Sequence, residues 1–565
     1  MKQSFSTFLA LVALNVTIWA QNTREVQMVS PNLNLNPAGI SISSENGDLS
    51  ALLYKDTGDE SVWLRTSDGR GINWGLPLRI DDDTTGSSKK TSKYSLKVDD
   101  NRIYIAWEDR RNGTKDDLYF TSSEDSGLTW LPANIRLDDG FGPGNNDLKD
   151  FRIGSGGKDV IAICSTDDGL ESLFLTYSND AGATWSPAIE VTTHNGFCDV
   201  DNIDMACEDD IAYIVWRDNF NNGVDDSVWM SIFNFKNGSF VAQDINVSPI
   251  ASGLGGDADD GVCVAVDDNY LCVLFHADNL GGSSEQIRVN MSSDLGLTFT
   301  GDFQVGEYDN ASLNHDVDNG CLVIEDGKVA VAWRDDRAGH DEIYCAVADF
   351  ATGIFTSDHI CSNSVLGVSA PHIAGEFGGE PLAISWSQGS VGAYYSCYLV
   401  NDVWSSPFVV SNNLGEVDDL RLTWNDTYNN FLALYLCDSG GRPEVWAGGY
   451  RAQQIDPGDP IAGNHAVFSI SGFKALDSFQ VVVAENQGTL LISDGRNLGI
   501  AFDNYTRITK NLSAFGGVLD SDGNASTTSL VIPPALSGKS LYMLAVSINN
   551  GSVRNFSDVT RVDIQ

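Results

Sequence analysis

The stretch "SSEDSGLTWLP" (residues 122–132) decides the fold of this chain because its pattern returns. Ser-x-Asp-x-Gly-x-Thr followed by an aromatic residue recurs in "YSNDAGATWSP" (177–187) and "MSSDLGLTFTG" (291–301), and "RTSDGRGINWG" (65–75) is a copy with one extra residue before Gly71. Ser and Asp side chains bond to the backbone of tight turns, and Gly supplies a left-handed backbone angle. We therefore interpret the pattern as a structural turn, silent on catalysis. Its defining residues are Ser123, Asp125, Gly127 and Trp130, then Ser178, Asp180, Gly182 and Trp185, then Ser292, Asp294, Gly296 and Phe299.

A longer repeat of about fifty residues surrounds this turn. In its three clearest copies an alternating apolar strand ends in Trp107, Trp216 or Trp333, and an Asp, a glycine-containing loop and a second strand follow. Weaker copies bring the number of units to eight, with seven as the alternative if one weak copy is an excursion. Strict alternation and short turns predict strands, and no helix is expected. Four-stranded units that repeat and stack are typical of an all-β, multi-bladed β-propeller.

The two ends of the repeat array predict a closed ring and a second domain. The eighth unit lacks an outer strand, and "REVQMVS" (24–30) resembles the outer strands of other units, so we expect it to complete the last blade. The repeat stops after Pro457 and Pro460, and about seven short strands follow. This predicts a propeller over 24–456 and a small immunoglobulin-like β-sandwich over 460–565. The latter resembles a C-terminal module of exported bacterial proteins.

Composition excludes some partners and predicts a location. The chain has 34 Lys and Arg against 78 Asp and Glu, a formal net charge of −44, which argues against nucleic acid and anionic lipid as partners. Residues 1–20 have the pattern of a secretory signal peptide, and no later apolar run is long enough to cross a bilayer. We expect a monomer that is secreted or held at the cell surface. Among the ten cysteines, Cys263 could pair with Cys272 and Cys345 with Cys361.

The turn pattern resembles the Asp-box, or BNR repeat, of the sialidase-like (neuraminidase) superfamily, and the likeness covers about residues 24–456. This resemblance implies that the boxes lie on the face opposite the ligand site. It also implies a glycoside hydrolase chemistry in which three arginines hold the substrate carboxylate, a Tyr–Glu pair is the nucleophile and an Asp donates the proton. The family's Arg-Ile-Pro is only echoed by Arg152 and Ile153, which Gly154 follows.

Candidate site residues come from the loops that join the second and third strands and from the inner strands. Arginine suits a carboxylate ligand because its fork bonds bidentately. The candidate ligand-binding residues are Arg110, Arg152, Arg217, Arg334, Arg337 and Arg421. For acid–base chemistry Asp336, Glu307, Tyr308 and Glu376 are candidates, although no spacing selects them. The Asp after each Trp is interpreted as a structural residue, either a turn cap or part of an Arg–Asp pair between neighbouring blades. The functional alternative is a calcium ligand, to which residues 137–150 and 254–261 could contribute.

These observations favour a non-catalytic propeller that binds a carbohydrate or a cell-surface glycoconjugate and requires no cofactor. Eight units differ from the six blades of sialidases, which separates this chain from the strict family pattern. The alternative function is an exo-α-sialidase-like glycoside hydrolase that acts on acidic sugars. The discriminating feature is a cluster of three arginines that face a Tyr–Glu pair.

Overall fold

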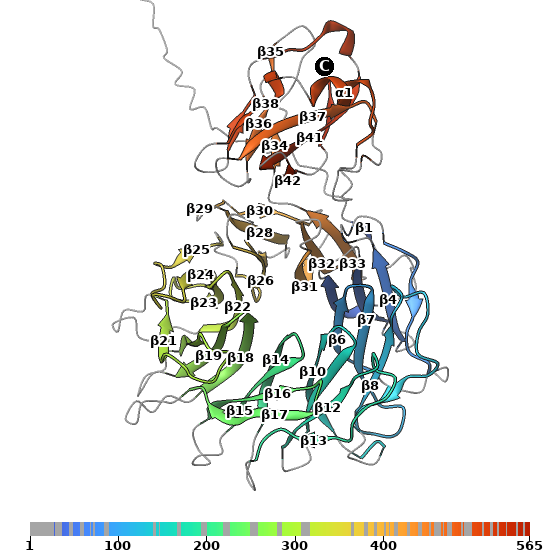
Figure 1. Ribbon diagram of the computed structural model, residues 1–565, viewed down its shortest axis with the longest axis vertical. Coiled ribbons are helices and arrows are strands. Elements are labelled where there is room, and N and C mark those ends of the chain that lie inside the picture. Colours follow the sequence, from blue (N-terminus) through green and yellow to red (C-terminus); the bar gives the residue numbers. More distant parts are fainter. Residues whose placement is uncertain are drawn as a thin grey trace, which may run out of the picture.

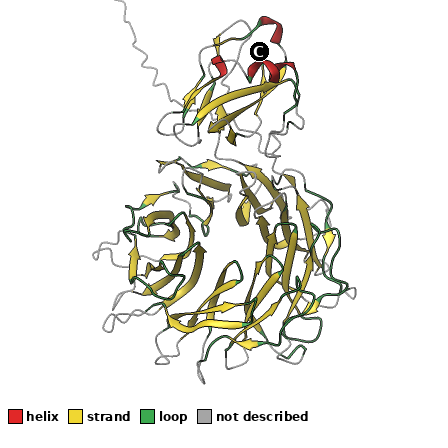
Figure 2. Cartoon of the chain, viewed as in Figure 1, coloured by secondary structure: helices red, strands yellow, loops and turns green. Residues whose placement is uncertain are grey.

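A computed structural model of the chain is nearly all β (Figure 1 and Figure 2). It describes residues 27–28, 37–44, 49–56, 61–67, 69, 71, 74–83, 90–138, 143–145, 147–166, 171–193, 200–218, 226–248, 258–278, 285–306, 317–362, 367–377, 382–388, 393–400, 403–405, 407–411, 416–425, 430–438, 443–450, 454–456, 465–466, 468–471, 477–486, 490, 500–510, 513–519, 524–527, 530–537, 539–549, 552–557 and 560–564. The predicted signal peptide lies outside these residues. No helix within them is long and apolar enough to cross a membrane.

Among the described residues, antiparallel sheets repeat along the chain, seven of four strands and one of five, and we number them sheet 1 to sheet 8 in chain order. Sheet 1 holds β2 (Pro37–Ser44), β3 (Ser50–Asp56), β4 (Ser61–Ser67) and β5 (Leu78–Arg79). Sheet 2 holds β6 (Lys90–Asp99), β7 (Arg102–Asp109), β8 (Asp117–Ser123) and β9 (Ile135–Arg136). Sheet 3 holds β10 (Leu148–Gly156), β11 (Asp159–Thr166), β12 (Leu173–Ser178) and β13 (Ile189–Glu190). Sheet 4 holds β14 (Asp201–Glu208), β15 (Ile211–Asp218), β16 (Ser227–Asn234) and β17 (Ser239–Asn246).

The second half of the array continues in the same way. Sheet 5 holds β18 (Ala258–Asp267), β19 (Tyr270–Asp278), β20 (Glu285–Ser292) and β21 (Asp302–Val305). Sheet 6 holds β22 (Val317–Glu325), β23 (Lys328–Asp335), β24 (Glu342–Asp349) and β25 (His359–Ile360). Sheet 7 holds β26 (His372–Gly375), β27 (Leu382–Gln388), β28 (Ala393–Val400), β29 (Val403–Trp404) and β30 (Phe408–Val409). Sheet 8 holds β31 (Glu416–Asn425), β32 (Asn430–Asp438), β33 (Pro443–Tyr450) and β1 (Gln27–Met28).

The sheets stand around a ring with their first strands nearest the centre (Figure 1). First strands of successive sheets contact one another, and β31 of sheet 8 contacts β2 of sheet 1. Hydrogen bonds join neighbouring sheets: Val98 N donates to Ser43 Oγ at 2.9 Å, and Asn425 Nδ2 donates to Ser44 Oγ at 2.6 Å across the junction of sheets 8 and 1. The arrangement is propeller-like, as the repeat predicts.

The N-terminal strand joins the last sheet, which confirms the predicted closure. In β1, Gln27 lies opposite Ala447 and Met28 opposite Trp446, so the strand pairs antiparallel with β33. This pairing covers an edge of sheet 8 that would otherwise expose unpaired backbone groups.

The second strands carry the core because both of their faces are covered by neighbouring sheets. Strand β15, "IAYIVWRD", is therefore apolar along most of its length, with Trp216 fully buried. Trp107 and Trp333 occupy the same place in β7 and β23 and are also fully buried. Each of these rings packs against the preceding sheet, as the cluster of Trp216 with Ile161 and Ile163 of sheet 3 illustrates.

The repeated turn motif has the predicted local structure in all three clear copies. Ser123 Oγ donates to Asp125 Oδ1 at 2.9 Å and accepts from Gly127 N at 2.9 Å, while Thr129 donates to Asp125 from N and from Oγ1 at 2.7 Å each. The hydrogen bonds from Thr129 lower the pKa of Asp125. The copies at Asp180 and Asp294 repeat these contacts. Gly127, Gly182 and Gly296 have φ of 83°, 86° and 81°, the left-handed region in which glycine is favoured.

The C-terminal part forms separate sheets and contains two apolar clusters. These sheets hold β34 (Gln454–Asp456), β35 (His465–Ala466), β36 (Ser469–Ser471), β37 (Ser478–Ala484), β38 (Gly516–Val518), β39 (Ala525–Ser526), β40 (Leu530–Val531), β41 (Ser540–Asn549), β42 (Ser552–Phe556) and β43 (Thr560–Asp563). Side chains of β36, including Ile470, pack with Val481 of β37 and Met543 of β41. The prediction of no helix is wrong here, because residues Asn504–Thr509 form the short helix α1. Asp503 caps its N-terminus, since Asp503 Oδ1 accepts hydrogen bonds from Tyr505 N and Thr506 N. Two short 3-10 turns, η1 (Ser513–Phe515) and η2 (Pro534–Leu536), follow.

Candidate functional site

The two ends of the ring carry different kinds of residue. Because the strands alternate in direction, the first strands begin at the end where the loops between second and third strands lie; we call this end the top face. The turn motif follows the third strand and lies at the other end, the bottom face. The six arginines predicted as ligand-binding all lie on first strands or near the top ends of second strands.

Three of these arginines form bidentate or cross-strand ion pairs at the top face. Arg110 donates from Nε and Nη2 to the two oxygens of Asp116 at 2.7 Å each, and this hydrogen bonding raises the pKa of Arg110. Arg334 donates from Nε to Asp318 at 2.7 Å. Arg217 donates from Nη2 to Asp201 at 3.1 Å. Each pair fixes donors and acceptors in one geometry at the rim of the ring.

Arg337 belongs to a structural device that occurs twice. Its backbone N donates to Asp335 Oδ1 at 2.8 Å, its Nε donates to Asp335 Oδ2 at 2.7 Å, and its guanidinium lies 4.3 Å from the ring centre of Tyr344. Arg111 makes the same contacts with Asp109 (2.9 Å from N and from Nε) and lies 4.0 Å from the ring of Tyr119. The repetition favours a structural role for Arg337. It also confirms the interpretation of Asp109 and Asp335, the Asp residues after Trp107 and Trp333, as turn caps.

Arg152 and Arg421 occupy the same position on their first strands. Each follows a β-bulge at the start of the strand, and each donates from Nη1 to the Asp two residues before it and to the intervening carbonyl. About two fifths of each side chain stays exposed, 38% for Arg152 and 39% for Arg421. Bulges often redirect side chains next to binding sites.

Pairing register defines an inner ring of eight equivalent residues. Each of these residues lies on the first strand of its sheet. Its partner on the second strand is the residue directly before the buried aromatic side chain of that strand, or directly before Cys164 in sheet 3. The inner ring consists of Ser41, Ser95, Arg152, Asp204, Cys263, Cys321, His372 and Arg421. The sequence alone does not reveal this layer because bulges shift the register by different amounts in different sheets.

Neighbours within the inner ring contact one another or the next first strand. Arg152 Nε lies 3.4 Å from Asp204, and Asp204 Oδ2 accepts from Val264 N at 3.0 Å. Burial raises the pKa of Cys321 to about 12 and lowers that of His372 to about 3, so the thiol stays protonated and the imidazole neutral. Among the described residues, no three His, Cys, Asp or Glu side chains are placed to hold a metal ion.

Glu108 is the residue of this face that sequence reasoning missed. Its side chain is 3% exposed, and burial raises its pKa to about 8, although Lys93, whose Nζ lies 3.8 Å away, favours the charged form. The signal was present in the sequence: Glu108 stands directly after Trp107, where Arg217 and Arg334 follow their own tryptophans. The Nζ atom of Lys93 also contacts the backbone carbonyl of Lys149. The Nζ atom of Lys149 contacts the carboxylates of Glu171 and Asp201.

The acid–base candidates do not form a cluster within the described residues. Glu307 and Tyr308 lie outside the part of the chain that the structure describes. Asp336 is half-buried in the loop that carries Arg337, and its carbonyl accepts from Gly339 N at 2.7 Å. Glu376 accepts a hydrogen bond from the indole of Trp424 at 2.9 Å, which places it in a structural contact.

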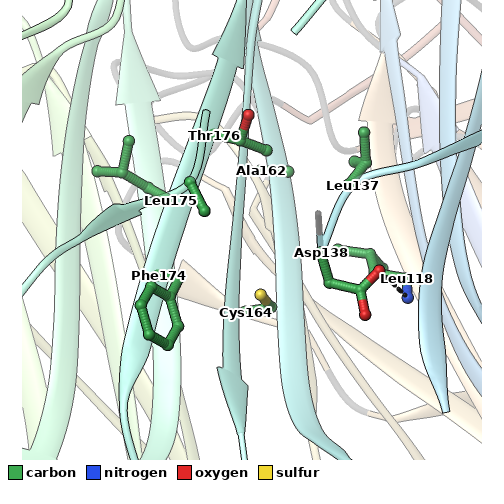
Figure 3. A pocket seen from close by; sticks show the side chains of 9 residues that line it. Leu118, Leu137, Asp138, Ala162, Cys164, Phe174, Leu175 and Thr176 are labelled. Carbon is green, nitrogen blue, oxygen red and sulfur yellow. Dashed lines mark hydrogen bonds between the residues drawn. The ribbon is translucent and has the colours of Figure 1, made fainter. Parts of the chain in front are cut away.

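A small cavity between sheets 2 and 3 is structural (Figure 3). It is lined by residues that include Asp138, Cys164 and Thr176, and its open volume of about 10 Å³ accommodates one water. Asp138 Oδ1 accepts from Leu118 N at 3.3 Å, as Ser248 Oγ accepts from Val228 N at 2.8 Å in sheet 4. Because the same hydrogen bond from a third-strand backbone N to a side-chain oxygen occurs in two sheets, we interpret it as a structural feature of the repeat and not as part of a ligand site.

Comparison with known proteins gives weak similarities to solved structures. No family model and no curated protein matches the chain. An ulvan lyase of polysaccharide lyase family PL25 is 11% identical, with 72% of this chain and 89% of that chain covered and a TM-score of 0.39. The Trypanosoma rangeli sialidase is 11% identical, with 76% and 89% covered and a TM-score of 0.34. A protein of unknown function from Dyadobacter fermentans is 13% identical, with 76% and 98% covered and a TM-score of 0.37. Scores and identities this low carry no argument about residues or activity.

Proposed function

We propose that the chain is an exported, monomeric protein whose residues 24–456 form an eight-bladed, sialidase-like propeller with Asp-box turns and whose residues 460–565 form an immunoglobulin-like β-sandwich. Its function is to bind a carbohydrate or a cell-surface glycoconjugate with the top face, without sialidase activity. The eight sheets, joined through β31 and β2, support this number of blades.

The observation that carries the proposal is that the six predicted arginines form ion pairs within the chain. All six predicted arginines engage an aspartate of the chain itself. A guanidinium that binds a substrate carboxylate bidentately needs two adjacent N–H donors free for that substrate. Here the paired charges instead present fixed donors and acceptors, which suit the hydroxyl groups of a sugar.

The charge of the chain narrows the ligand to neutral glycans. The formal net charge of −44 repels an acidic polysaccharide that approaches the ring. Arg110, Arg152 and Arg421 keep side-chain exposures of 38%, 38% and 39%, so a ligand at the top face reaches them without opening the fold.

A glycoside hydrolase is the second candidate, and Glu108 is the observation that favours it. A carboxyl group with a pKa of about 8 is protonated at neutral pH and is able to donate a proton to a leaving group. Its 3% exposure weighs against direct contact with a sugar. We therefore rank binding first.

Two assays on the full chain separate these functions. A glycan microarray is expected to show saturable binding to neutral glycans, and a fluorogenic sialoside is expected to release no fluorophore. Turnover of the sialoside at a rate proportional to protein concentration would overturn the binding proposal in favour of the hydrolase. Absence of binding to every glycan on the array would overturn the binding proposal, and absence of sialoside turnover in the same sample would remove the second candidate as well.

Paired variants test the location of the site. The double variant Arg110→Gln with Asp116→Asn removes both charges of a top-face ion pair and keeps polar side chains of similar shape. The matched control Lys236→Gln with Asp210→Asn does the same to a 2.6 Å ion pair at the bottom face. We expect the first variant to weaken glycan binding by about ten- to a hundredfold, the range for charge-assisted hydrogen bonds, and the second to leave it unchanged.

A further inference from the structure

Two buried cysteines of sheet 6 stand side by side. The Sγ atoms of Cys345 and Cys361 lie 3.2 Å apart, and the two residues are 0% and 1% exposed. Cys345 lies in the third strand, β24, and Cys361 directly follows the outer strand, β25. A disulfide has an S–S length of about 2.05 Å, so small side-chain rotations separate this contact from a covalent bond.

The strand register explains why the two thiols meet. Cys345 is paired with His359, and Cys361 N donates to Ile343 O at 2.8 Å, so the two cysteines are diagonal neighbours on adjacent strands. Alternation along both strands directs Cys345 and Cys361 to the same face of the sheet, where both join the core between sheets 6 and 7.

Other cysteines of the chain have different surroundings. Cys263 is paired with Leu274 and Cys272 with Ala265, so these two cysteines are also diagonal neighbours on adjacent strands, and the contact of the sulfur atom is what distinguishes the two pairs. Cys263 Sγ contacts the carbonyl of Gly320 at 3.4 Å. The sulfur–sulfur contact at Cys345 therefore singles out one of the two pairs that the sequence suggested.

We propose that Cys345 and Cys361 are a disulfide-forming pair. One thiol, as its thiolate, attacks a sulfur of a low-molecular-weight disulfide and releases one thiol from it. The second thiolate then attacks the mixed disulfide and releases the other. The two cysteines lose two protons and two electrons, and the oxidant takes them up as it becomes two thiols.

The bond would secure the short outer strand of sheet 6. Strand β25 has two residues and pairs with β24 only at Tyr344–Ile360 and Cys345–His359. Directly beyond it, Ser362 Oγ accepts from Ile343 N at 2.8 Å, and directly before it Asp358 pairs with Arg337 at 2.7 Å. A covalent link at Cys361 fixes the segment between these two contacts.

The experiment counts thiols in the full chain after refolding with oxidised glutathione. The sample is quenched in acid, alkylated under denaturing conditions and digested without reductant. We expect a cross-linked peptide pair containing residues 345 and 361, the loss of two hydrogen masses, and a lower melting temperature after reduction. Alkylation of both cysteines to the level of the fully reduced sample would overturn the proposal.

Two variants distinguish the loss of this disulfide from a general effect of removing a buried cysteine. In Cys345→Ala, Cys361 is expected to become alkylated and the melting temperature to stop responding to reductant. The control Cys272→Ala removes a cysteine that is also buried and is expected to keep the cross-linked peptide. A cross-link from Cys361 to another cysteine in the wild type contradicts the pairing, and this readout does not depend on either variant folding.

Discussion

Replacing Glu108 with glutamine should change how the stability of the protein depends on pH. The carboxyl group is buried, and its pKa rises from 4.5 to about 8 in the folded chain. In the unfolded chain the group ionises near 4.5, so between these two pH values unfolding releases a proton. Stability contributed by protonated Glu108 is therefore present at low pH and is lost as pH rises toward 8.

The size of this effect follows from the shift. Each pKa unit corresponds to about 1.4 kcal/mol, so the free energy of unfolding should fall by about 3 to 5 kcal/mol across the interval because of this one group. The glutamine side chain of the variant carries no charge at any pH and keeps the shape of the glutamate that it replaces. The difference in stability between E108Q and the wild type should therefore grow in favour of E108Q as pH rises.

Urea unfolding followed by tryptophan fluorescence at pH 4, 6, 8 and 9 (conditions spanning roughly the linkage window) measures this difference. Lys93→Met is the companion variant: Lys93 lowers the pKa of Glu108, so its loss should move the window to higher pH. Parallel stability curves for E108Q and the wild type would refute the reasoning, because they would mean that Glu108 is ionised in the folded state.

Three further outcomes follow from the contacts described above. Gly182→Ala should destabilise the chain by roughly 2 to 4 kcal/mol in urea unfolding, because its Cβ would lie 2.3 Å from Phe120, whereas Gly339→Ala, with a similar φ and open space, should cost less. Removing residues 1–30 should lower the melting temperature and promote association measured by light scattering, because it exposes the edge of β33 that β1 covers; an unchanged, monomeric product would contradict the closure. Asp503→Ala should destabilise the C-terminal unit by about 1 kcal/mol, as measured by hydrogen exchange in α1, because it removes the cap; unchanged exchange would count against it.

Local features of this fold could be predicted from the sequence. The turn motif depends on bonds among residues within a few positions of one another, so Ser123, Asp125 and Thr129 contain the information for their own geometry. The closure strand could be predicted because its pattern matches other outer strands. The Asp caps after Trp107 and Trp333 could be predicted because they repeat.

Features that depend on neighbouring sheets could not be predicted. The pKa of Glu108 depends on burial and on charges that other segments bring near it, and the inner ring depends on bulges whose register the sequence does not specify. The partners of Arg217 and Arg334 come from the neighbouring first strand, as the hydrogen bond of Arg334 to Asp318 illustrates. Helix α1 was missed because six residues are too few to show a helical period, and only its Asp503 cap marks it.

Hydrogen exchange measured with and without the glycan that binds best on the array tests the central claim, that the top face carries the ligand. The account predicts slower exchange in segments of the top face, residues 110–116, 148–152 and 334–341. Protection confined to the turn motifs at 123–130, 178–185 and 292–299 would contradict it.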